Sequence, residues 1–437
     1  MRRLLKHIFF VLIMIMLILP FIQHQFNMPK IRALKGAYST PQKPHWNAAN
    51  FWNGTFQDSM NTYIEQSIGY RPHFVRLHNQ LQYSLFDTIN AQDVILGKEG
   101  YLYELNYIKA YYGLDYVGDE KVNEDVQKTV AIANWLKAND KLLLIVLAPG
   151  KGSFFPEYIP EVYEVNKRGS TNYNTYYEKL KQEQIAVIGG NHFFSAIKDT
   201  SQFALFPKAG IHWSYYGMGL IFDSVFQLIE HHLDREFIDF KITNIKVSSK
   251  LKSPDRDLWE GMNIIFPPDD YPMPYPEFKF EITDSNQMPR VITVADSYYW
   301  QWFGGGYPLK GFSDNSFWYY NKQVFYPDER PMKDRAVVPI LDAVLNTDVI
   351  LILQTDANMN RFSFGFIDEL YALIKDGGEA EIKKQQAIRE IAERIRQSES
   401  YMESIREKAI KRGVTTEEML MLDAGWIYKN KQNEIMP

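Results

Sequence analysis

The stretch Pro289-Arg290-Val291-Ile292-Thr293-Val294-Ala295-Asp296-Ser297 gives the clearest indication of the fold. Its middle, Val291 to Ala295, is uncharged and mostly β-branched, which is typical of a central parallel strand that is covered on both faces. Open α/β sheets bind their ligands at the carboxyl ends of such strands, and this strand ends in Asp296-Ser297. Ser297 is therefore a candidate nucleophile, although a polar strand exit or a helix cap would explain the same pair of residues.

Three other apolar runs have the same character as this strand. They are residues 141–148, 185–188 and 348–354. Segments with helical periodicity lie between the runs, at 119–139, 173–184 and 218–234. Buried strands that alternate with helices predict an α/β core with a mostly parallel sheet.

The N-terminus combines a basic start with an apolar run. Residues 2–7 include Arg, Lys and His side chains, and residues 8–22 are apolar throughout. This pattern is typical of an export signal whose basic flank stays in the cytoplasm. No A-x-A cleavage site follows, so residues 1–26 are interpreted as an uncleaved signal anchor in preference to a cleaved signal peptide. The rest of the chain is then expected outside the inner membrane, in the periplasm or an equivalent extracytoplasmic space.

Composition divides the remainder of the chain into three parts. Residues 27–45 are rich in proline and polar side chains and are expected to form a linker. Residues 46–376 form the predicted α/β domain, in which residues 235–288 are expected to be an insertion. Residues 377–437 form a charged helical tail, and the spacing of isoleucines from 379 to 411 predicts one long, weakly amphipathic helix.

The composition argues against several classes of function. The 437 residues carry a formal net charge of −5, which gives no support for nucleic-acid binding. The chain has no cysteine, which removes disulfides and thiolate catalysis. The sequence contains neither an H-E-x-x-H pattern nor a phosphate-cradling glycine loop, so no metal and no cofactor is expected.

Four segments together resemble one known family. They are Val94 to Tyr103 with its glycine turn, Ala148 to Pro160 with its proline–lysine loop, Ile211-His212-Trp213-Ser214, and Ala295-Asp296-Ser297. In order and spacing, over about residues 45–375, they resemble the alginate O-acetylation proteins AlgJ and AlgX of the SGNH hydrolase superfamily. The resemblance implies a flavodoxin-like, three-layer α/β/α core.

The resemblance also implies a reaction and the residues that perform it. Ser297 stands where the family has its nucleophile, and His212 stands where the family has its base. The implied chemistry is acetyl transfer to, or removal from, an exported polysaccharide. Family members usually work beside a membrane-bound O-acyltransferase that delivers the acetyl group. This chain would meet such a partner at the inner membrane, which it reaches through its N-terminal helix.

One position departs from the family pattern. Many members carry an aspartate two residues before the histidine, and here that position is Gly210. Three explanations stay open: Asp356, at the end of strand 348–354, replaces the missing acid; a backbone carbonyl or a water holds the imidazole ring; or the site is weak or inactive. Asp296 is expected to support the site beside Ser297.

Six residues are predicted to contact the substrate. They lie in loops after the strands or beside Ser297 and His212: Lys151, Trp213, Tyr298, Trp300, Asn358 and Arg361. Aromatic faces can stack on sugar rings, but aromatic side chains are more often part of a core. Two or three of the ten aromatic residues at 298–303, 307 and 317–320 are therefore expected to line a groove. For Lys151, a plain turn lysine is an equal explanation.

The sequence thus predicts a serine-dependent O-acetyltransferase that modifies an exported cell-surface or secreted polysaccharide. Two alternatives stay open. In a carbohydrate acetylesterase, water rather than a sugar hydroxyl meets the acyl-enzyme. A non-catalytic glycan-binding or assembly subunit is the other alternative, and Gly210 is the reason to consider it.

Overall fold

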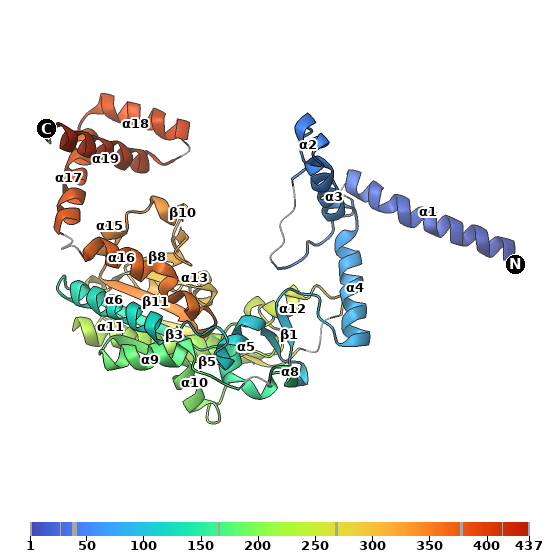
Figure 1. The fold of residues 1–437 in the computed structure, drawn as a ribbon. Coiled ribbons are helices and arrows are strands. Elements are labelled where there is room, and N and C mark those ends of the chain that lie inside the picture. The colour runs from blue at the N-terminus through green and yellow to red at the C-terminus, as the bar shows by residue number, and fades with distance from the viewer. Residues whose placement is uncertain are drawn as a thin grey trace.

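A seven-stranded sheet forms the centre of the molecule (Figure 1). The computed structural model describes residues 2–26, 28–36, 42–164, 167–266, 270–375, 379–412 and 414–435. The strands follow the order β10-β9-β8-β7-β11-β3-β4. Their bounds are β3 (Leu142–Ala148), β4 (Ala186–Gly189), β7 (Arg290–Ala295), β8 (Asp314–Tyr319), β9 (Gln323–Phe325), β10 (Lys333–Asp334) and β11 (Val349–Thr355).

The neighbouring strands from β4 to β8 are parallel, and β9 and β10 add an antiparallel edge. The four apolar runs of the sequence correspond to β3, β4, β7 and β11, so the predicted α/β core with a mostly parallel sheet is confirmed. Strand β8 has the sequence DNSFWY, which contains no comparable apolar run, and it escapes prediction for that reason.

Helices cover both faces of this sheet. Leu144 and Val146 of β3 pack into one apolar core, and Leu143 and Ile145 pack into another, because alternate side chains of a strand point to opposite faces. The first core includes α11 (Tyr215–Leu233), and the second includes α6 (Asp119–Lys137), α9 (Asn172–Gln182), α15 (Ile340–Leu345) and α16 (Phe366–Ile374). The core therefore has three layers.

Short elements connect these layers. They are β1 (Val94–Leu96), η1 (Lys98–Gly100), β2 (Leu102–Glu104), α5 (Leu105–Tyr112), α7 (Lys151–Phe154), η2 (Pro156–Tyr158), α8 (Glu161–Glu164), α10 (Gly190–Ile197), η4 (Ser285–Gln287), η5 (Ser297–Tyr299), α13 (Trp300–Gly304), α14 (Pro308–Gly311), η6 (Arg335–Val337) and η7 (Asp356–Gly365). β1 and β2 pair antiparallel across the glycine turn, as the sequence predicts.

Residues 235–288, expected to be an insertion, contain a long antiparallel pair of strands. β5 (Ile238–Ser248) pairs with β6 (Met273–Ile282), and both contact α11. Between these strands lie η3 (Ser253–Asp255) and α12 (Asp257–Gly261). This segment therefore packs on the same side of the sheet as α11.

The two ends of the chain extend from the core in different directions (Figure 1). α1 (Arg2–Phe26) is followed by α2 (Ala48–Trp52), α3 (Thr55–Ser67) and α4 (Arg71–Phe86). Among the described residues, α1 is the one helix long and apolar enough to cross a membrane. The tail forms three helices, α17 (Glu379–Arg396), α18 (Glu399–Arg412) and α19 (Thr416–Ile435). The prediction of one helix over 379–411 is wrong, because the chain breaks at Ser398, a residue type that favours helix starts.

Candidate active site

Ser297 lies where β7 ends and the helical turn η5 begins. The buried Asp296 fixes this exit: its carboxylate accepts hydrogen bonds from Tyr298 N at 3.1 Å, and from Thr355 N and Oγ1 at 2.8 Å each. The Asn358 amide donates a further bond, at 2.9 Å. Asp296 therefore joins the ends of β7 and β11 and holds the turn that presents Ser297.

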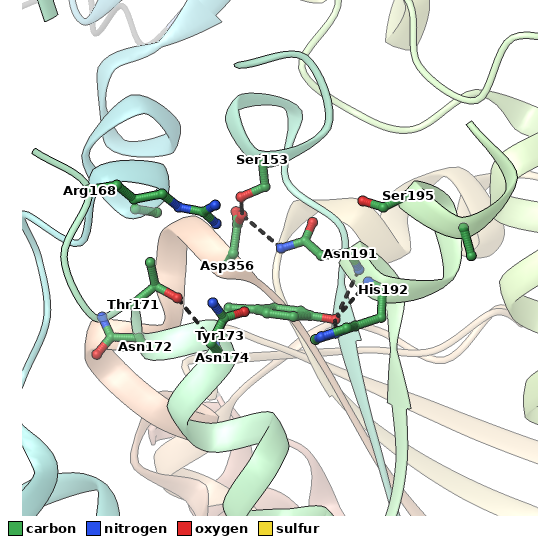
Figure 2. Close-up of a pocket in the computed structure, with 12 residues that line it drawn as sticks. Ser153, Arg168, Thr171, Asn172, Tyr173, Asn174, Asn191, His192, Ser195 and Asp356 are labelled. Carbon is green, nitrogen blue, oxygen red and sulfur yellow. Dashed lines mark hydrogen bonds between the residues drawn. The ribbon is translucent and has the colours of Figure 1, made fainter. Parts of the chain in front are cut away.

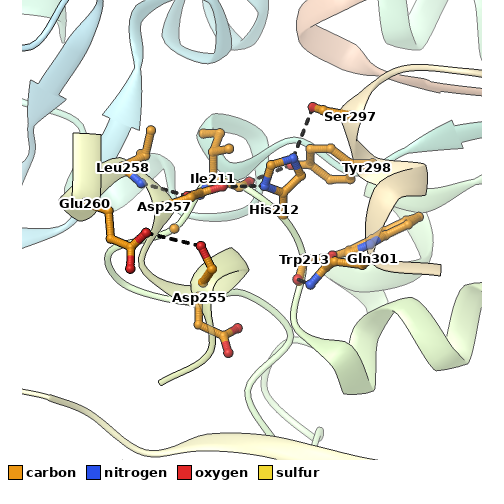
Figure 3. Close-up of polar contacts among 12 residues, drawn as sticks. Ile211, His212, Trp213, Asp255, Asp257, Leu258, Glu260, Ser297, Tyr298 and Gln301 are labelled. Carbon is orange, nitrogen blue, oxygen red and sulfur yellow. Dashed lines mark hydrogen bonds and ion pairs between the residues drawn. The ribbon is translucent and has the colours of Figure 1, made fainter. Parts of the chain in front are cut away.

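His212 lies between Ser297 and a carboxylate (Figure 3). Its Nε2 is 3.0 Å from Ser297 Oγ, and its Nδ1 is 2.5 Å from Asp257 Oδ2. With Nδ1–H donating to the carboxylate, Nε2 carries the lone pair and accepts the serine proton. Serine, histidine and aspartate in this order form the arrangement that activates a serine hydroxyl in many unrelated folds.

The acid of this arrangement is Asp257, which sequence reasoning missed. Asp257 is the first residue of α12, and its Oδ1 accepts hydrogen bonds from Ile211 N at 2.9 Å and from Leu258 N at 2.8 Å. Both carboxylate oxygens are thus engaged, one with the histidine and one with the backbone beside it. Nothing local in the sequence marks Asp257, since it lies 45 positions after His212 in the segment interpreted as an insertion.

The candidate acid Asp356 lies elsewhere, and its assignment to His212 is corrected. Figure 2 shows Asp356 with Ser153 and Asn191 in a cavity that does not include His212 or Ser297. The volume of this cavity is about 520 Å³. Its Oδ2 accepts hydrogen bonds from Ser153 Oγ at 2.6 Å and from Asn191 Nδ2 at 3.2 Å. Burial raises the pKa of this carboxyl to about 6. Its position at the end of a parallel strand suggested the role, but β11 directs the side chain toward β3 and β4.

Gly210 has a steric role in this site. A Cβ atom at this position would lie 2.2 Å from the carbonyl oxygen of Pro254 and 2.8 Å from the carbonyl carbon of Asp255. The absence of a side chain therefore lets the segment that leads to Asp257 pass against the His212 loop. The glycine that removes the expected acid also makes room for the segment that supplies another one.

The pKa of His212 is raised above its ordinary value. Burial by itself lowers this pKa, because it penalises the imidazolium form, but the charge and the hydrogen bond of Asp257 outweigh burial. The charges of Glu104 and Asp296 act in the same direction as Asp257. His212 therefore binds a proton more readily than a free histidine, as a general base for a serine hydroxyl requires.

A cavity of about 510 Å³ opens beside the Ser297 hydroxyl. Its lining residues come from η3, α11, α12 and α13 and from the loops next to them: His212, Tyr215, Lys252, Ser253, Pro254, Asp257, Ser297, Trp300, Gln301, Gly304, Gly305 and Tyr307. Lys252 Nζ lies 4.4 Å from the ring centroid of Tyr215 and 4.7 Å from that of Tyr275. The cavity thus combines aromatic surface with one cation.

Of the three aromatic residues predicted to contact the substrate, one lines the cavity and two lie in the core. Trp300 lines the cavity, and Tyr307 joins it there, so two of the ten aromatic residues considered have this position. Trp213 and Tyr298 are fully buried, and Tyr298 donates its hydroxyl to Ile211 O at 2.6 Å. The prediction that Trp213 and Tyr298 contact substrate is corrected, since both side chains pack inside the core beneath His212.

Lys151 is also an internal residue. Its side chain is fully buried, and Nζ donates hydrogen bonds to Lys208 O and Gly210 O, both at 2.7 Å. Burial lowers the pKa of this amine well below its ordinary value, and the charge of Asp257 opposes the effect. Lys151 therefore holds the loop that carries His212, and the prediction of a substrate contact is corrected.

Asn358 and Arg361 follow β11 in η7. The Asn358 amide donates to Asp296 and to Thr355 Oγ1, at 2.9 and 3.0 Å, so it supports the exit of β7. Arg361 is exposed, and its carbonyl oxygen accepts a bond from Gln354. Among the described residues, neither Asn358 nor Arg361 lines the Ser297 cavity.

Tyr320, one of the ten aromatic residues considered, is hydrogen-bonded to the end of β7. It follows β8 in a left-handed conformation, with φ of 49°, and its N–H donates to Ala295 O at 2.9 Å. Burial, with the nearby charge of Asp296, raises the pKa of this phenol. Tyr320 therefore keeps its proton at neutral pH.

Comparison with known proteins gives a likeness of fold. No protein-family model and no curated protein sequence matches the chain. Among solved structures, the chain is similar to the O-acetyltransferase domain of Pseudomonas putida AlgJ (TM-score 0.38, 11% identity), with 63% of this chain and 99% of that one covered. It is similar to Pseudomonas aeruginosa AlgX (0.39, 14%; 63% and 66% covered) and to Bacillus cereus PatB1 (0.40, 10%; 62% and 99% covered).

Proposed function

We propose that this protein is a serine-dependent O-acetyltransferase that modifies an exported polysaccharide. The observation that carries the proposal is the hydrogen-bonded chain from Asp257 through His212 to Ser297, at the edge of an open cavity. Gly210 was the reason to consider a non-catalytic subunit, and the presence of Asp257 in the place of the missing acid removes that reason.

The first half-reaction acetylates the serine. As Ser297 Oγ attacks the carbonyl carbon of the acetyl donor, its proton passes to Nε2 of His212. Asp257 stabilises the imidazolium that forms and keeps the ring in the orientation that the attack requires. When the tetrahedral intermediate collapses, the donor oxygen leaves with the proton from His212, and an acetyl ester remains on Ser297.

The second half-reaction passes the acetyl group to a sugar. A hydroxyl of the glycan gives its proton to the neutral His212 and attacks the acetyl ester. The intermediate then collapses, the proton returns to Ser297 Oγ, and the sugar carries the acetyl group. Water in place of the sugar hydroxyl would release acetate, and the enzyme would then be an acetylesterase.

One group is positioned to stabilise the oxyanion of each intermediate. The N–H of Ser297 begins η5, where helical N–H groups have no partner within the helix. A single oxyanion donor contributes about 10²–10³ in turnover in a serine hydrolase.

The cavity provides the chemistry of a carbohydrate site. Tyr215, Trp300 and Tyr307 offer aromatic surface, and the amide of Gln301 and the hydroxyl of Ser253 are polar groups in the same lining. Aromatic faces combined with a few polar groups are typical of sites that bind sugar rings. This composition supports a glycan, rather than a small acetyl ester alone, as the second substrate.

The proposed setting is the outer face of the inner membrane. α1 would anchor the chain, and the α/β domain would lie in the periplasm or its equivalent. A membrane-bound O-acyltransferase would deliver the acetyl group across the membrane, as the resemblance to AlgJ and AlgX implies. The net charge of −5 fits a glycan substrate rather than a nucleic acid.

One assay tests the proposal. The full-length chain is incubated with an activated acetyl ester, with and without acceptor oligosaccharides, and mass spectrometry follows acetyl groups on the protein and on the sugar. We expect an acetyl ester on Ser297 and, with an acceptor, acetylated sugar. Ser297→Ala should abolish both, whereas Ser153→Ala, which removes a hydroxyl from the other cavity, should leave both in place. Equal acetylation by wild type and Ser297→Ala would refute the proposal, and acetate release without sugar product would favour the esterase.

A further inference from the structure

Helix α4 carries an apolar stripe that no other part of the described chain covers. Phe74, Leu77, Leu81 and Leu85 follow one another at spacings of three and four residues, so they lie on one face of the helix. Their exposed fractions are 46%, 49%, 50% and 67%. Four large apolar side chains in a row are more than isolated exposed hydrophobic residues, and such a patch marks an interaction surface.

The opposite face of α4 is attached to the catalytic domain. Asn79 is buried, and its amide donates to Met262 O at 2.8 Å. Gln80 accepts hydrogen bonds from the backbone N–H groups of Ile265 and Phe266. The apolar stripe therefore points away from the domain that holds Ser297.

The start of α4 is joined to the end of α1. The side chain of Gln23 accepts a hydrogen bond from Tyr70 N at 3.2 Å, and His24 Nδ1 lies 2.8 Å from Ser67 O. A Cβ atom on Gly69 would lie 2.0 Å from Pro20 O, so the glycine allows the two backbones to meet. This junction involves the last turns of α1, where a membrane-spanning helix with its basic end in the cytoplasm reaches the outer interface.

The described residues between α1 and α3 include exposed side chains of the types found at a membrane interface. Trp46, Phe51 and Trp52, just before α3, are exposed aromatic side chains. Lys30 and Arg32, in the segment after α1, are exposed cations. Tryptophan is enriched at the level of lipid headgroups, and cations beside an apolar helix face attract anionic lipids.

We infer that α4, with α2 and Trp46, lies on the outer surface of the membrane that α1 spans, and that lipid covers its apolar stripe. Interfacial helices lie in the plane of the membrane with the apolar face toward the acyl chains. In Figure 1, α1 extends away from the catalytic domain beyond the α3–α4 junction, which places the membrane on the far side of α4 from the domain. The inference rests on the proposed anchoring by α1 and does not depend on the proposed reaction.

This arrangement would fix the catalytic cavity relative to the membrane. Met262, which receives the Asn79 bond, directly follows α12, the helix that begins with Asp257. Lys35 and Asn263 add a pair of hydrogen bonds between the segment after α1 and the same loop. The lipid-bound helix and the acid of the site are thus joined through one short connection.

The absence of cysteine from the chain permits a direct test. Single cysteines are introduced into the full-length protein by Leu77→Cys, Leu81→Cys and Leu85→Cys, and each is labelled with a fluorophore. Leu309→Cys in α14 and Ile410→Cys in α18 are matched controls, since both are exposed apolar residues of other parts of the chain. The proteins are reconstituted in vesicles of phosphatidylcholine and phosphatidylglycerol, with brominated acyl chains as lipid quenchers and iodide as an aqueous quencher.

We expect brominated lipid to quench the three α4 labels at least twofold more than the control labels, and iodide to show the reverse order. Iodide quenching of the α4 labels equal to that of the controls would overturn the inference. α4 labels that are open to iodide in vesicles but protected in native membranes would overturn it as well, because a protein partner would then cover the stripe. An inactive Ser297→Ala background should give the same quenching as wild type.

Discussion

At the scale of single residues, Asp257 has two effects on His212. It holds Nδ1 through a hydrogen bond, and its charge and that bond raise the pKa of the ring against the opposing effect of burial. Asp257→Asn removes the charge, and loss of a triad aspartate lowers turnover by ~10⁴-fold in a serine protease. We expect a loss of that order. The pKa of His212 should also fall, so the rising limb of activity against pH should move to lower pH.

The measurement is turnover as a function of pH for wild type, Asp257→Asn and Asp356→Asn. In the proposed mechanism neutral His212 is the base, so activity should rise as pH passes through its pKa, and a lower pKa should move that rise to lower pH. Asp356→Asn serves as the control, because Asp356 contacts Ser153 and Asn191 rather than the histidine. A comparable loss of turnover in Asp356→Asn would contradict the assignment of Asp257 as the acid.

What the sequence revealed of the site depended on how local each signal was. Ser297 follows a buried strand and His212 stands in a short motif, so both could be predicted from neighbouring residues. Asp257 reaches His212 only because β5 and β6 bring its segment back to the core, and no nearby pattern reports that return. The burial of Lys151 and Trp213 escapes prediction, because burial of a loop residue cannot be read from its neighbours.

At the scale of elements, the fit between the His212 loop and the η3–α12 segment depends on Gly210. In Gly210→Ala, the new methyl group would meet Pro254 O at 2.2 Å, and backbone atoms on both sides would have to move. Because Asp257 lies three residues after Pro254, we expect turnover to fall by about tenfold or more, since small displacements in a catalytic site have costs of this order. Substrate binding should change less than turnover.

Gly261→Ala is the matched control for this prediction. Gly261 ends α12, and a Cβ atom there would have no neighbour within 4 Å. Steady-state kinetics of both variants with the same acetyl donor provide the comparison. If Gly210→Ala keeps the turnover of wild type, the close approach of the two segments is not required for the position of Asp257.

Lys151 supports the same loop from within the core. Lys151→Met keeps the approximate volume of the side chain but leaves Gly210 O without its donor, whereas Lys208 O keeps its hydrogen bond from Leu102 N. A buried acceptor that loses its partner costs about 1–3 kcal/mol, so the free energy of unfolding should fall by roughly that amount. Urea denaturation of the full chain in detergent measures this loss.

A surface lysine provides the control for Lys151→Met. Lys322→Met should leave the midpoint of denaturation within experimental error, because substitutions at exposed positions seldom change stability by more than about 0.5 kcal/mol. If Lys151 instead contacted substrate, Lys151→Met would raise KM with no loss of stability.

At the scale of the whole molecule, the sheet could be predicted and the arrangement around it could not. The apolar runs of β3, β4, β7 and β11 report burial on both faces, which only a covered parallel sheet provides. The packing of residues 235–288 on α11 depends on contacts such as Phe278 against Gly219, which are distant in the chain. The join between α1 and α4 is of the same kind, since Pro20 and Gly69 meet only in the folded chain.

The buried carboxyl of Asp356 gives the stability of the whole molecule a dependence on pH. Its pKa is about 6 in the folded protein and 3.8 as the ordinary value, so the folded state binds the proton more tightly than the unfolded state. The favourable contribution of the neutral carboxyl is therefore complete below about pH 4 and is lost as the pH rises toward 6. Over this window the free energy of unfolding falls by roughly 3 kcal/mol, at about 1.36 kcal/mol per pKa unit.

Asp356→Asn removes this titration, so the difference in unfolding free energy between wild type and variant should change in one direction as the pH rises. The wild type should lose stability relative to Asp356→Asn as the pH rises from 4 to 7, by an amount that approaches roughly 3 kcal/mol. Asp199→Asn, at an exposed position, should show no such trend. Urea denaturation curves at several pH values provide the test. A difference that stays constant with pH would mean that Asp356 titrates alike in the folded and unfolded chains, and that Ser153 and Asn191 compensate fully for its burial.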